Sequence, residues 1–213
     1  MGESSYSIDR AVTSVLTPIL RSDGFSRSGR SFRRVEGGFI QAVQVQPNRH
    51  GGSFAVNLGL HPEGVPDALG APPNVDNIDP TLCVFRRRLA EVGSDQWWAF
   101  DSTRESLDRA MSAAANLYVR VGRKCFAEQV GPDAPLKTIA PDDFEAGRFD
   151  LSGFSATKVQ MARVVALMGL LAGDLERARA FATIGLNNLG AAHGLRRELE
   201  SIVAGAWVQP LEA

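Results

Sequence analysis

Apolar side chains alternate with polar or small ones over residues 54–60, and this is the clearest period-two pattern in the chain. Such alternation predicts a strand with one buried face. Residues 39–46 show a similar pattern, and the turn-forming residues 47–52 between the two segments predict a loose hairpin. With residues 31–35 as the first strand, we expect three or four consecutive antiparallel strands.

Two later segments are candidates for the same sheet. Residues 82–89 alternate as a strand would, although a short helix is the alternative interpretation. The Trp97-Trp98 pair and Phe100 predict another short strand. The five prolines from His61 to Pro80 inclusive predict a long loop, and we expect this loop to shape a binding edge.

The chain opens with apolar residues at helical spacing, directly after the potential N-cap Ser7 and as far as Leu20. This spacing predicts an amphipathic helix. Pro18 has no amide donor, so we expect a kink or an early stop there, with Gly24 ending the helix.

Further helices are expected in the second half of the chain. Ser102 with Glu105 three residues later matches a capping box, which predicts a helix that runs towards Phe126. Apolar stripes at helical spacing predict three more helices, over residues 155–171, 174–189 and 195–206.

These elements predict an α+β fold in which an antiparallel sheet of four to six strands packs against helices and is followed by a C-terminal helical hairpin or bundle. We expect an α+β sheet domain over residues 1–130. Prolines, glycines and acids over residues 131–153 predict a linker. Residues 154–213 would then form a helical bundle, which either packs on the first domain or stands apart from it.

The composition is that of a soluble globular protein, with 44% apolar and 22% charged residues in a chain of 213. Lys and Arg total 23 against 24 Asp and Glu, so no global field attracts the chain to nucleic acid or to an anionic membrane. No apolar run approaches the roughly 20 residues of a membrane span. The two distant cysteines, Cys83 and Cys125, and the absence of a secretion signal favour the cytoplasm.

Candidate catalytic groups are few. His50, His61 and His193 are the histidines, and each occupies a position typical of a surface or cap residue. None has a metal-ligand spacing to another His or Cys, and no phosphate-binding glycine motif is present, so we predict neither a metal nor a cofactor. A thiol–imidazole pair of Cys83 with His61 is conceivable, but nothing in the sequence brings the two together.

Amides and guanidinium groups on the predicted strands are the stronger signal. A polar side chain within a strand needs a partner or solvent, so this face is either wet or available to a ligand. Adjacent tryptophans on a strand point to opposite faces, which leaves one of them to be covered or exposed. The candidate binding residues are Arg33, Gln44, Gln46, Asn57, Arg86, Arg88, Trp97 and Trp98.

Six short motifs in the N-terminal half follow one another in a recognisable order. The motifs are Leu20 to Phe25, Arg30 to Arg33, Val45-Gln46, Phe54 to Gly59, Arg86 to Leu89 and Asp95 to Trp98. Together they resemble an uncharacterised, mainly bacterial family of domains of unknown function, of the DUF4304 type. The resemblance covers about residues 8–120 and implies an α+β domain with no established activity. The Pro-rich segment between His61 and Cys83 is longer than that pattern leads us to expect.

The hypothesis that follows is a non-catalytic binding module, with another protein as its partner in an immunity-like or adaptor role. An enzyme that acts on a small anion is the alternative, with Arg33, Arg86 or Arg88 holding the anion. The third hypothesis is nucleic-acid binding through the basic block Arg21–Arg34, which has five arginines but few interleaved aromatic residues. We expect no membrane partner, and the sequence leaves the oligomeric state open.

Overall fold

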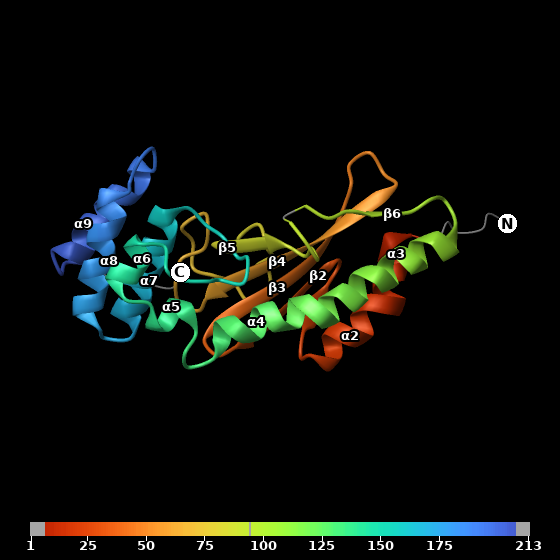
Figure 1. Cartoon of the computed structure of the whole chain (residues 1–213), viewed down its shortest axis with the longest axis horizontal. Helices are drawn as coiled ribbons and strands as arrows, with labels where there is room; N and C mark the ends of the chain where they lie inside the picture. Colours follow the sequence, from red (N-terminus) through yellow and green to blue (C-terminus); the bar gives the residue numbers. More distant parts are fainter. Residues whose placement is uncertain (1–6, 94, 208–213) are drawn as a thin grey trace.

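The computed structural model describes residues 7–93 and 95–207, and within them one antiparallel sheet of six strands has helices on one face and at one end (Figure 1). Strands β1 to β5 lie side by side in chain order, and β6 pairs with the first residues of β4. The predicted α+β fold is confirmed. The strands are β1 (Ser26–Ser28), β2 (Ser31–Glu36), β3 (Phe39–Pro47), β4 (Ser53–Pro62), β5 (Phe85–Arg88) and β6 (Trp98–Ala99).

The strand register produces one apolar face. Phe32 of β2, Val43 of β3 and Leu58 of β4 are paired in a row across the sheet, and all three are fully buried. Because side chains alternate along a strand, every second residue of each strand points to the same face as this row. Residues 85–88, for which strand and helix were both considered, form a strand paired with β4.

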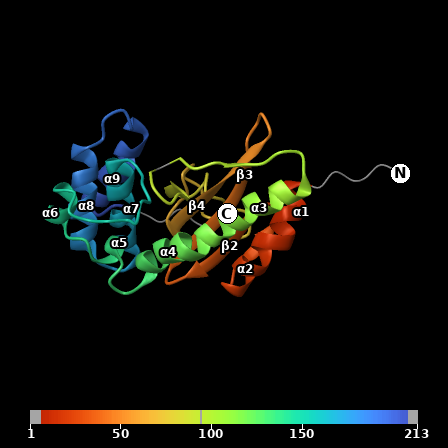
Figure 2. The same cartoon turned by 45° about the vertical axis from the view of Figure 1, so that its right-hand side comes forward.

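Two long helical segments cover the apolar face and lie side by side there (Figures 1 and 2). The first is the N-terminal helix and the second follows β6, as the sequence predicted. The first consists of α1 (Ile8–Ala11), the π-helical turn η1 (Val12–Leu16) and α2 (Thr17–Ser22), and the second of α3 (Arg104–Leu117), the π-helical turn η2 (Tyr118–Gly122) and α4 (Arg123–Val130).

Pro18 changes the N-terminal helix less than expected. The helix widens into η1 just before the proline, where the Thr17 hydroxyl donates to the Val12 carbonyl (2.9 Å), and it then continues to Ser22. A widened turn accommodates a residue that has no amide hydrogen to donate. Gly24 has a φ of 85° and ends the helix, as its position predicted.

The helix after β6 begins one residue later than predicted. Thr103, rather than Ser102, is its N-cap, and the Thr103 side chain accepts a hydrogen bond from the Ser106 amide (3.2 Å). The expected capping box with Glu105 is therefore wrong, because three residues after the true cap stands a serine. The Ser106 hydroxyl instead accepts from the Asp101 amide (3.1 Å).

The remaining helices form a bundle at one end of the sheet (Figure 1). Arg163 and Glu198 form an ion pair between α7 and α9, with Arg163 only 5% exposed. Each helix in the described part of the chain is too short or too polar to cross a lipid bilayer. The bundle contains α5 (Pro135–Thr138), α6 (Pro141–Glu145), α7 (Lys158–Leu171), α8 (Leu175–Asn187), η3 (His193–Leu195) and α9 (Arg196–Val203).

The segment predicted as a linker, residues 131–153, carries the short helices α5 and α6 and contributes buried apolar side chains to the main core. Leu136 and Phe144 are 3% and 2% exposed. Arg177 of α8 donates to the carbonyls of Ile139 (2.7 Å) and Leu136 (3.4 Å). The main core thus continues from the sheet into the bundle, and the division into two domains stays a prediction.

Asp23 joins the two helical segments that cover the sheet. Its carboxylate accepts a hydrogen bond from the Tyr118 hydroxyl (2.9 Å) and two from the Arg123 guanidinium (2.8 and 2.9 Å). Its carbonyl accepts from Arg34 of β2 (2.6 Å). Burial, followed by the nearby Asp23 charge, raises the pKa of Tyr118, so this hydroxyl stays protonated and donates.

Asp23→Ala should lower the free energy of unfolding by about 1–3 kcal/mol, because it leaves the Tyr118 hydroxyl without its acceptor. Urea titration followed by circular dichroism measures this change. Tyr118→Phe should cost much less in the Asp23→Ala background than in the wild type. Asp133→Ala, at an exposed position, is the matched control, and equal losses from Asp23→Ala and Asp133→Ala would contradict the assigned role.

Candidate functional site

The face of the sheet turned away from α1–α4, called the open face below, carries most of the predicted binding residues. The strand pairs fix its membership: Arg33 lies beside Ala42, Gln44 beside Asn57, and Asn57 beside Arg88. The residues on the open face are Ser31, Arg33 and Val35 of β2, Ile40, Ala42, Gln44 and Gln46 of β3, Ala55, Asn57, Gly59 and His61 of β4, and Arg86 and Arg88 of β5.

The Pro-rich loop, residues 63–84, occupies one half of the open face. Arg33 donates to the carbonyls of Ile78 and Asn77, the latter at 3.1 Å, and is only 7% exposed. Gln44 donates to the Asp79 carboxylate (3.0 Å). Burial lowers the pKa of Arg33, an effect opposed by the charge of Asp79. Arg33 and Gln44 therefore bind the chain's own loop.

Gly59 allows the loop to lie directly on β4. A Cβ atom at this position would lie 2.7 Å from the Cys83 Sγ and 2.8 Å from the Pro80 Cα. A second, smaller core of Ile40, Ala42, Ile78 and Cys83 fills the space beside this contact. The loop is thus packed against the sheet by apolar contacts as well as by hydrogen bonds.

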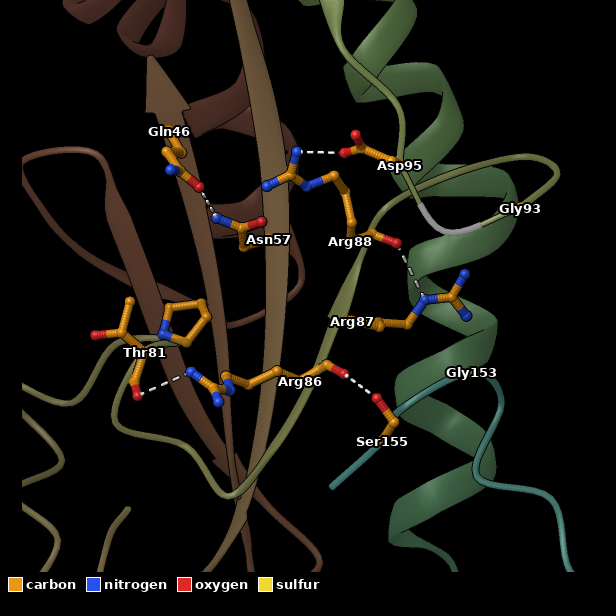
Figure 3. A pocket seen from close by; sticks show the side chains of 11 residues that line it. Gln46, Asn57, Thr81, Arg86, Arg87, Arg88, Gly93, Asp95, Gly153 and Ser155 are labelled. Carbon is orange, nitrogen blue, oxygen red and sulfur yellow. Dashed lines mark hydrogen bonds and ion pairs between the residues drawn. The ribbon is translucent and has the colours of Figure 1, made fainter. Parts of the chain in front are cut away.

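The other half of the open face is a groove of about 610 Å³ (Figure 3). The sheet forms its floor, and three loops form its walls. Gln46 accepts a hydrogen bond from Asn57 (2.7 Å) on the floor. The groove is lined by Gln46, Asn57, Pro80, Thr81, Arg86, Arg87, Arg88, Gly93, Asp95, Gly153 and Ser155.

The three consecutive arginines of β5 have different surroundings. Arg88 forms an ion pair with Asp95 (2.6 Å) and stacks on Trp97, with 4.6 Å between the guanidinium carbon and the ring centroid. Arg87 points to the helix side, where it donates to the Cys125 Sγ (2.8 Å) and to the Ser152 carbonyl. Arg86 is exposed, and among the described residues its side chain makes only a long hydrogen bond to the Thr81 carbonyl (3.5 Å).

Arg86 is therefore the cation of this groove with the weakest internal contacts. Within residues 7–93 and 95–207, no carboxylate lies within ion-pair distance of it. The backbone of Arg86 is nonetheless fixed, because its N–H and C=O pair with Ser155 (3.2 and 3.1 Å). The guanidinium thus projects from an anchored strand into the groove.

The two tryptophans lie in different surroundings, although only Trp98 belongs to β6, which is shorter than the strand predicted from Trp97 to Phe100. Trp98 is 7% exposed and stacks on Phe54 with ring centroids 5.7 Å apart, so it belongs to the core. Trp97 is 38% exposed and lies against Arg88 beside the groove. Of the eight candidate residues, five gather at the groove, namely Gln46, Asn57, Arg86, Arg88 and Trp97. Their role in binding stays a prediction.

His61 and Cys83 lie at the covered half of the open face, where both are fully buried. The His61 Nε2 contacts the Val65 carbonyl (2.7 Å) and its Nδ1 accepts from the Val84 amide (3.3 Å), an arrangement that requires a neutral ring with the proton on Nε2. Burial lowers the pKa of His61 and raises that of Cys83. Across the described residues, no three His, Cys, Asp or Glu side chains converge as metal ligands would.

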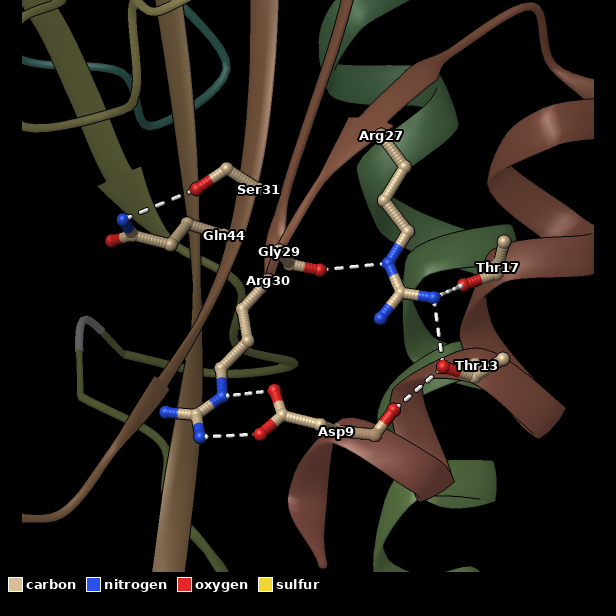
Figure 4. Close-up of polar contacts among 8 residues, drawn as sticks. All are labelled: Asp9, Thr13, Thr17, Arg27, Gly29, Arg30, Ser31 and Gln44. Atoms are coloured by element: carbon tan, nitrogen blue, oxygen red, sulfur yellow. Dashed lines mark hydrogen bonds and ion pairs between the residues drawn. The ribbon is translucent and has the colours of Figure 1, made fainter.

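The basic block Arg21–Arg34 does not form one continuous surface. Arg30 makes two hydrogen bonds to Asp9 (2.6 and 2.8 Å), and Arg27 donates to Thr13 (2.8 Å) and Thr17 (3.0 Å) (Figure 4). Arg33 lies on the open face, whereas Arg34 lies under the helices, 4.7 Å from the Phe25 ring centroid. Most of these arginines therefore have partners within the chain.

Sequence reasoning missed several residues that shape the groove. Asp95 belongs to a recognised motif, but its pairing with Arg88 depends on a loop path that the motif does not specify. Gly153 and Ser155 reach β5 from more than 60 positions away in the chain, through the bridge with Arg86. The one local signal was the glycine at position 153, which has a φ of 78° and suits a sharp turn.

A family model described as a domain of unknown function, DUF4304, matches residues 16–126, just over half of the chain. The chain belongs to this family. The match contains all six strands, the second half of the first helical segment and most of the second, and it ends before the bundle. Searches of curated proteins and of solved structures found no match. The family assignment therefore covers the open face but brings no activity with it.

Gly59→Ala should lower the free energy of unfolding by about 1–3 kcal/mol and loosen the Pro-rich loop, because the new methyl group collides with Pro80 and Cys83. Urea titration and amide hydrogen exchange in residues 63–84 measure the two effects. Gly131→Ala is the control: its Cβ would meet nothing within 4 Å, and it should change stability by less than about 0.5 kcal/mol. Unchanged exchange in the loop of Gly59→Ala would contradict the contact.

His61 should make stability depend on pH. Its pKa in the folded chain lies below the ordinary 6.5, so the unfolded chain binds the extra proton first. Full stability is expected above about pH 6.5 and a loss of at most about 1.4 kcal/mol per pH unit below it, down to the folded pKa. Asp67 and Arg163 influence His61 in opposite directions.

Urea titrations between pH 5 and 8 measure this slope in the wild type and in two variants. His61→Gln should lose the part of the slope that arises just below pH 6.5, whereas His193→Gln, at an exposed position, should keep it. A wild-type slope that persists in His61→Gln would show that other groups cause it.

Proposed function

We propose that this chain is a non-catalytic binding module that recognises another protein through the groove beside β5. The single observation that carries the proposal is the Arg86 guanidinium, which is exposed in a groove of about 610 Å³ and has no carboxylate partner among the described residues. Around it lie Gln46, Asn57, Arg88 and Trp97. Arginine and tryptophan are the residues most enriched where protein interfaces derive their binding energy.

Binding without chemistry is supported by the state of the two groups that an enzyme would need. His61 has both ring nitrogens engaged by backbone groups, and Cys83 is a buried thiol whose pKa is raised by burial. A thiol acts as a nucleophile mainly in its thiolate form. The alternative of an enzyme that acts on a small anion therefore retains arginines to hold the anion but has no accessible base or nucleophile among its candidate residues.

Nucleic-acid binding has weaker support. Arg27, Arg30, Arg33 and Arg34 have hydrogen-bond partners within the chain and lie in different parts of the surface or core. Such binding needs several cations aligned along one phosphate backbone. The groove offers one uncompensated guanidinium instead, which suits a single carboxylate of a protein.

We place this module in the cytoplasm of a bacterial cell, in an immunity-like or adaptor role. Both cysteines are unpaired thiols, as is usual in a reducing compartment. The bacterial setting comes from the resemblance of the sequence motifs, and the immunity-like role is an analogy with other small binding folds.

The proposal predicts a partner whose capture depends on Arg86. Wild-type protein, Arg86→Glu and Arg197→Glu are immobilised in equal amounts and exposed to lysate of the native cells. Arg197 is exposed on α9, remote in sequence from the groove residues, and serves as the matched control. A direct partner should bind the wild type and Arg197→Glu equally and Arg86→Glu at least about tenfold more weakly, because reversal of the charge repels its carboxylate.

The captured protein is then purified and its affinity for each variant is measured by calorimetry. Equal affinity for wild type and Arg86→Glu would contradict the use of this groove. Turnover of a small molecule by the pure chain, abolished in Arg86→Glu, would instead support the enzyme alternative.

A further inference from the structure

The open face already holds a peptide, which is the chain's own loop. Arg33 holds the main-chain carbonyls of Asn77 and Ile78, and Gln44 holds the Asp79 carboxylate. Asp79 also accepts hydrogen bonds from the amide and hydroxyl of Thr81 (2.7 and 2.6 Å), which stabilise a turn of the loop at this point. Guanidinium and carboxamide groups of this face therefore bind an acidic, turning segment of polypeptide.

The groove offers the same types of donor as the covered half. Gln46 follows Gln44 on the same face of β3, about 7 Å away along the strand. Arg86 of β5 lies across the sheet from Arg33 of β2, in the same cross-strand row, because Arg33 pairs with Ala42, Ala42 with Gly59 and Gly59 with Arg86. Gln46 uses its oxygen to accept from Asn57, and this leaves its amide hydrogens available as donors at an exposed position. The occupied and unoccupied halves thus repeat one set of groups.

The charge of the groove limits what can occupy it. Asp95 neutralises Arg88, and Arg87 turns its guanidinium under the strand. Arg86 is left as one positive charge without a carboxylate partner among the described residues, so an occupant with one well-placed carboxylate balances the site. The half-exposed Trp97 ring stacks with Arg88 at the edge of the groove and adds an aromatic surface there.

We infer that the groove binds an acidic segment of the partner protein, with an Asp or Glu side chain on Arg86 and main-chain oxygens on Gln46. This inference rests on the proposed function and specifies the chemistry of the partner. The groove volume of about 610 Å³ exceeds what one carboxylate or phosphate fills, which favours a segment of several residues over a small anion.

Two pools of capped eight-residue peptides of random sequence test the inference, one with Asp fixed at a central position and the other with Asn fixed there. Immobilised full-length protein should enrich peptides from the Asp pool. In fluorescence anisotropy the enriched peptides should bind Arg86→Gln at least about tenfold more weakly than wild type, and Gln46→Glu more weakly still, because a like charge faces the carboxylate. Arg197→Gln should bind as the wild type does.

Equal enrichment from both pools would overturn the inference, as would unchanged affinity of Arg86→Gln. Inorganic phosphate or a short single-stranded RNA that saturates the site as tightly as the enriched peptides would also overturn it. Thermal unfolding of each variant checks that it folds. If acidic peptides fail while the captured partner still depends on Arg86, the proposed function stands and the acidic segment is wrong; if neither depends on Arg86, both are wrong.

Discussion

The contact of the Arg33 guanidinium with the carbonyls of Asn77 and Ile78 determines how much of the open face a ligand can reach. A sheet with helices on one face must satisfy the polar groups of its other face by solvent, by its own chain or by a partner. Here the loop of residues 63–84 covers half of that face, and Arg33, Gln44 and the bare Cα of Gly59 hold it there. The groove is the part of the open face that this loop leaves uncovered, and Pro80 and Thr81 form the border between the loop and the groove.

The fold could be predicted from the sequence because its signals are local. Alternation over residues 39–46 and 54–60 predicted both strands and placed Gln46 and Asn57 on the polar face. The alternation over residues 82–89, for which a helix was the alternative, placed Arg86 and Arg88 there too, and the four residues do lie on one face. The loop path could not be predicted in this way. Arg33 meets carbonyls more than 40 positions later, and main-chain carbonyls carry no sequence identity. For the same reason the sequence did not predict the pairing of Ser155 with Arg86, which closes one side of the groove.

The arginines illustrate why composition alone is a poor guide to a binding surface. Arg30 pairs with Asp9, Arg123 with Asp23, and Arg163 with Glu198, so these charges connect helices and strands. Arg34 packs on an aromatic ring, and Arg87 contacts a thiol and a carbonyl. Such groups are already partnered, and a ligand would have to replace an existing contact in order to use them. A cation with only a long hydrogen bond to one carbonyl and no carboxylate partner among the described residues is therefore more informative than a dense basic block, and Arg86 of the groove is such a cation.

His61 and Cys83, the side chains most suited to catalysis, hold the Pro-rich loop on the sheet instead. His61 accepts from the Val84 amide and contacts the Val65 carbonyl, so each of its nitrogens connects β4 to an end of the Pro-rich segment. Cys83 lies against Gly59 within the small core under the same loop. To expose either group, the loop would have to leave the sheet, and Arg33 and Gln44 would then lose their partners. The uncovered half offers hydrogen-bond donors, a charge and, at its edge, an aromatic ring, and these groups suit the proposed recognition of a polypeptide.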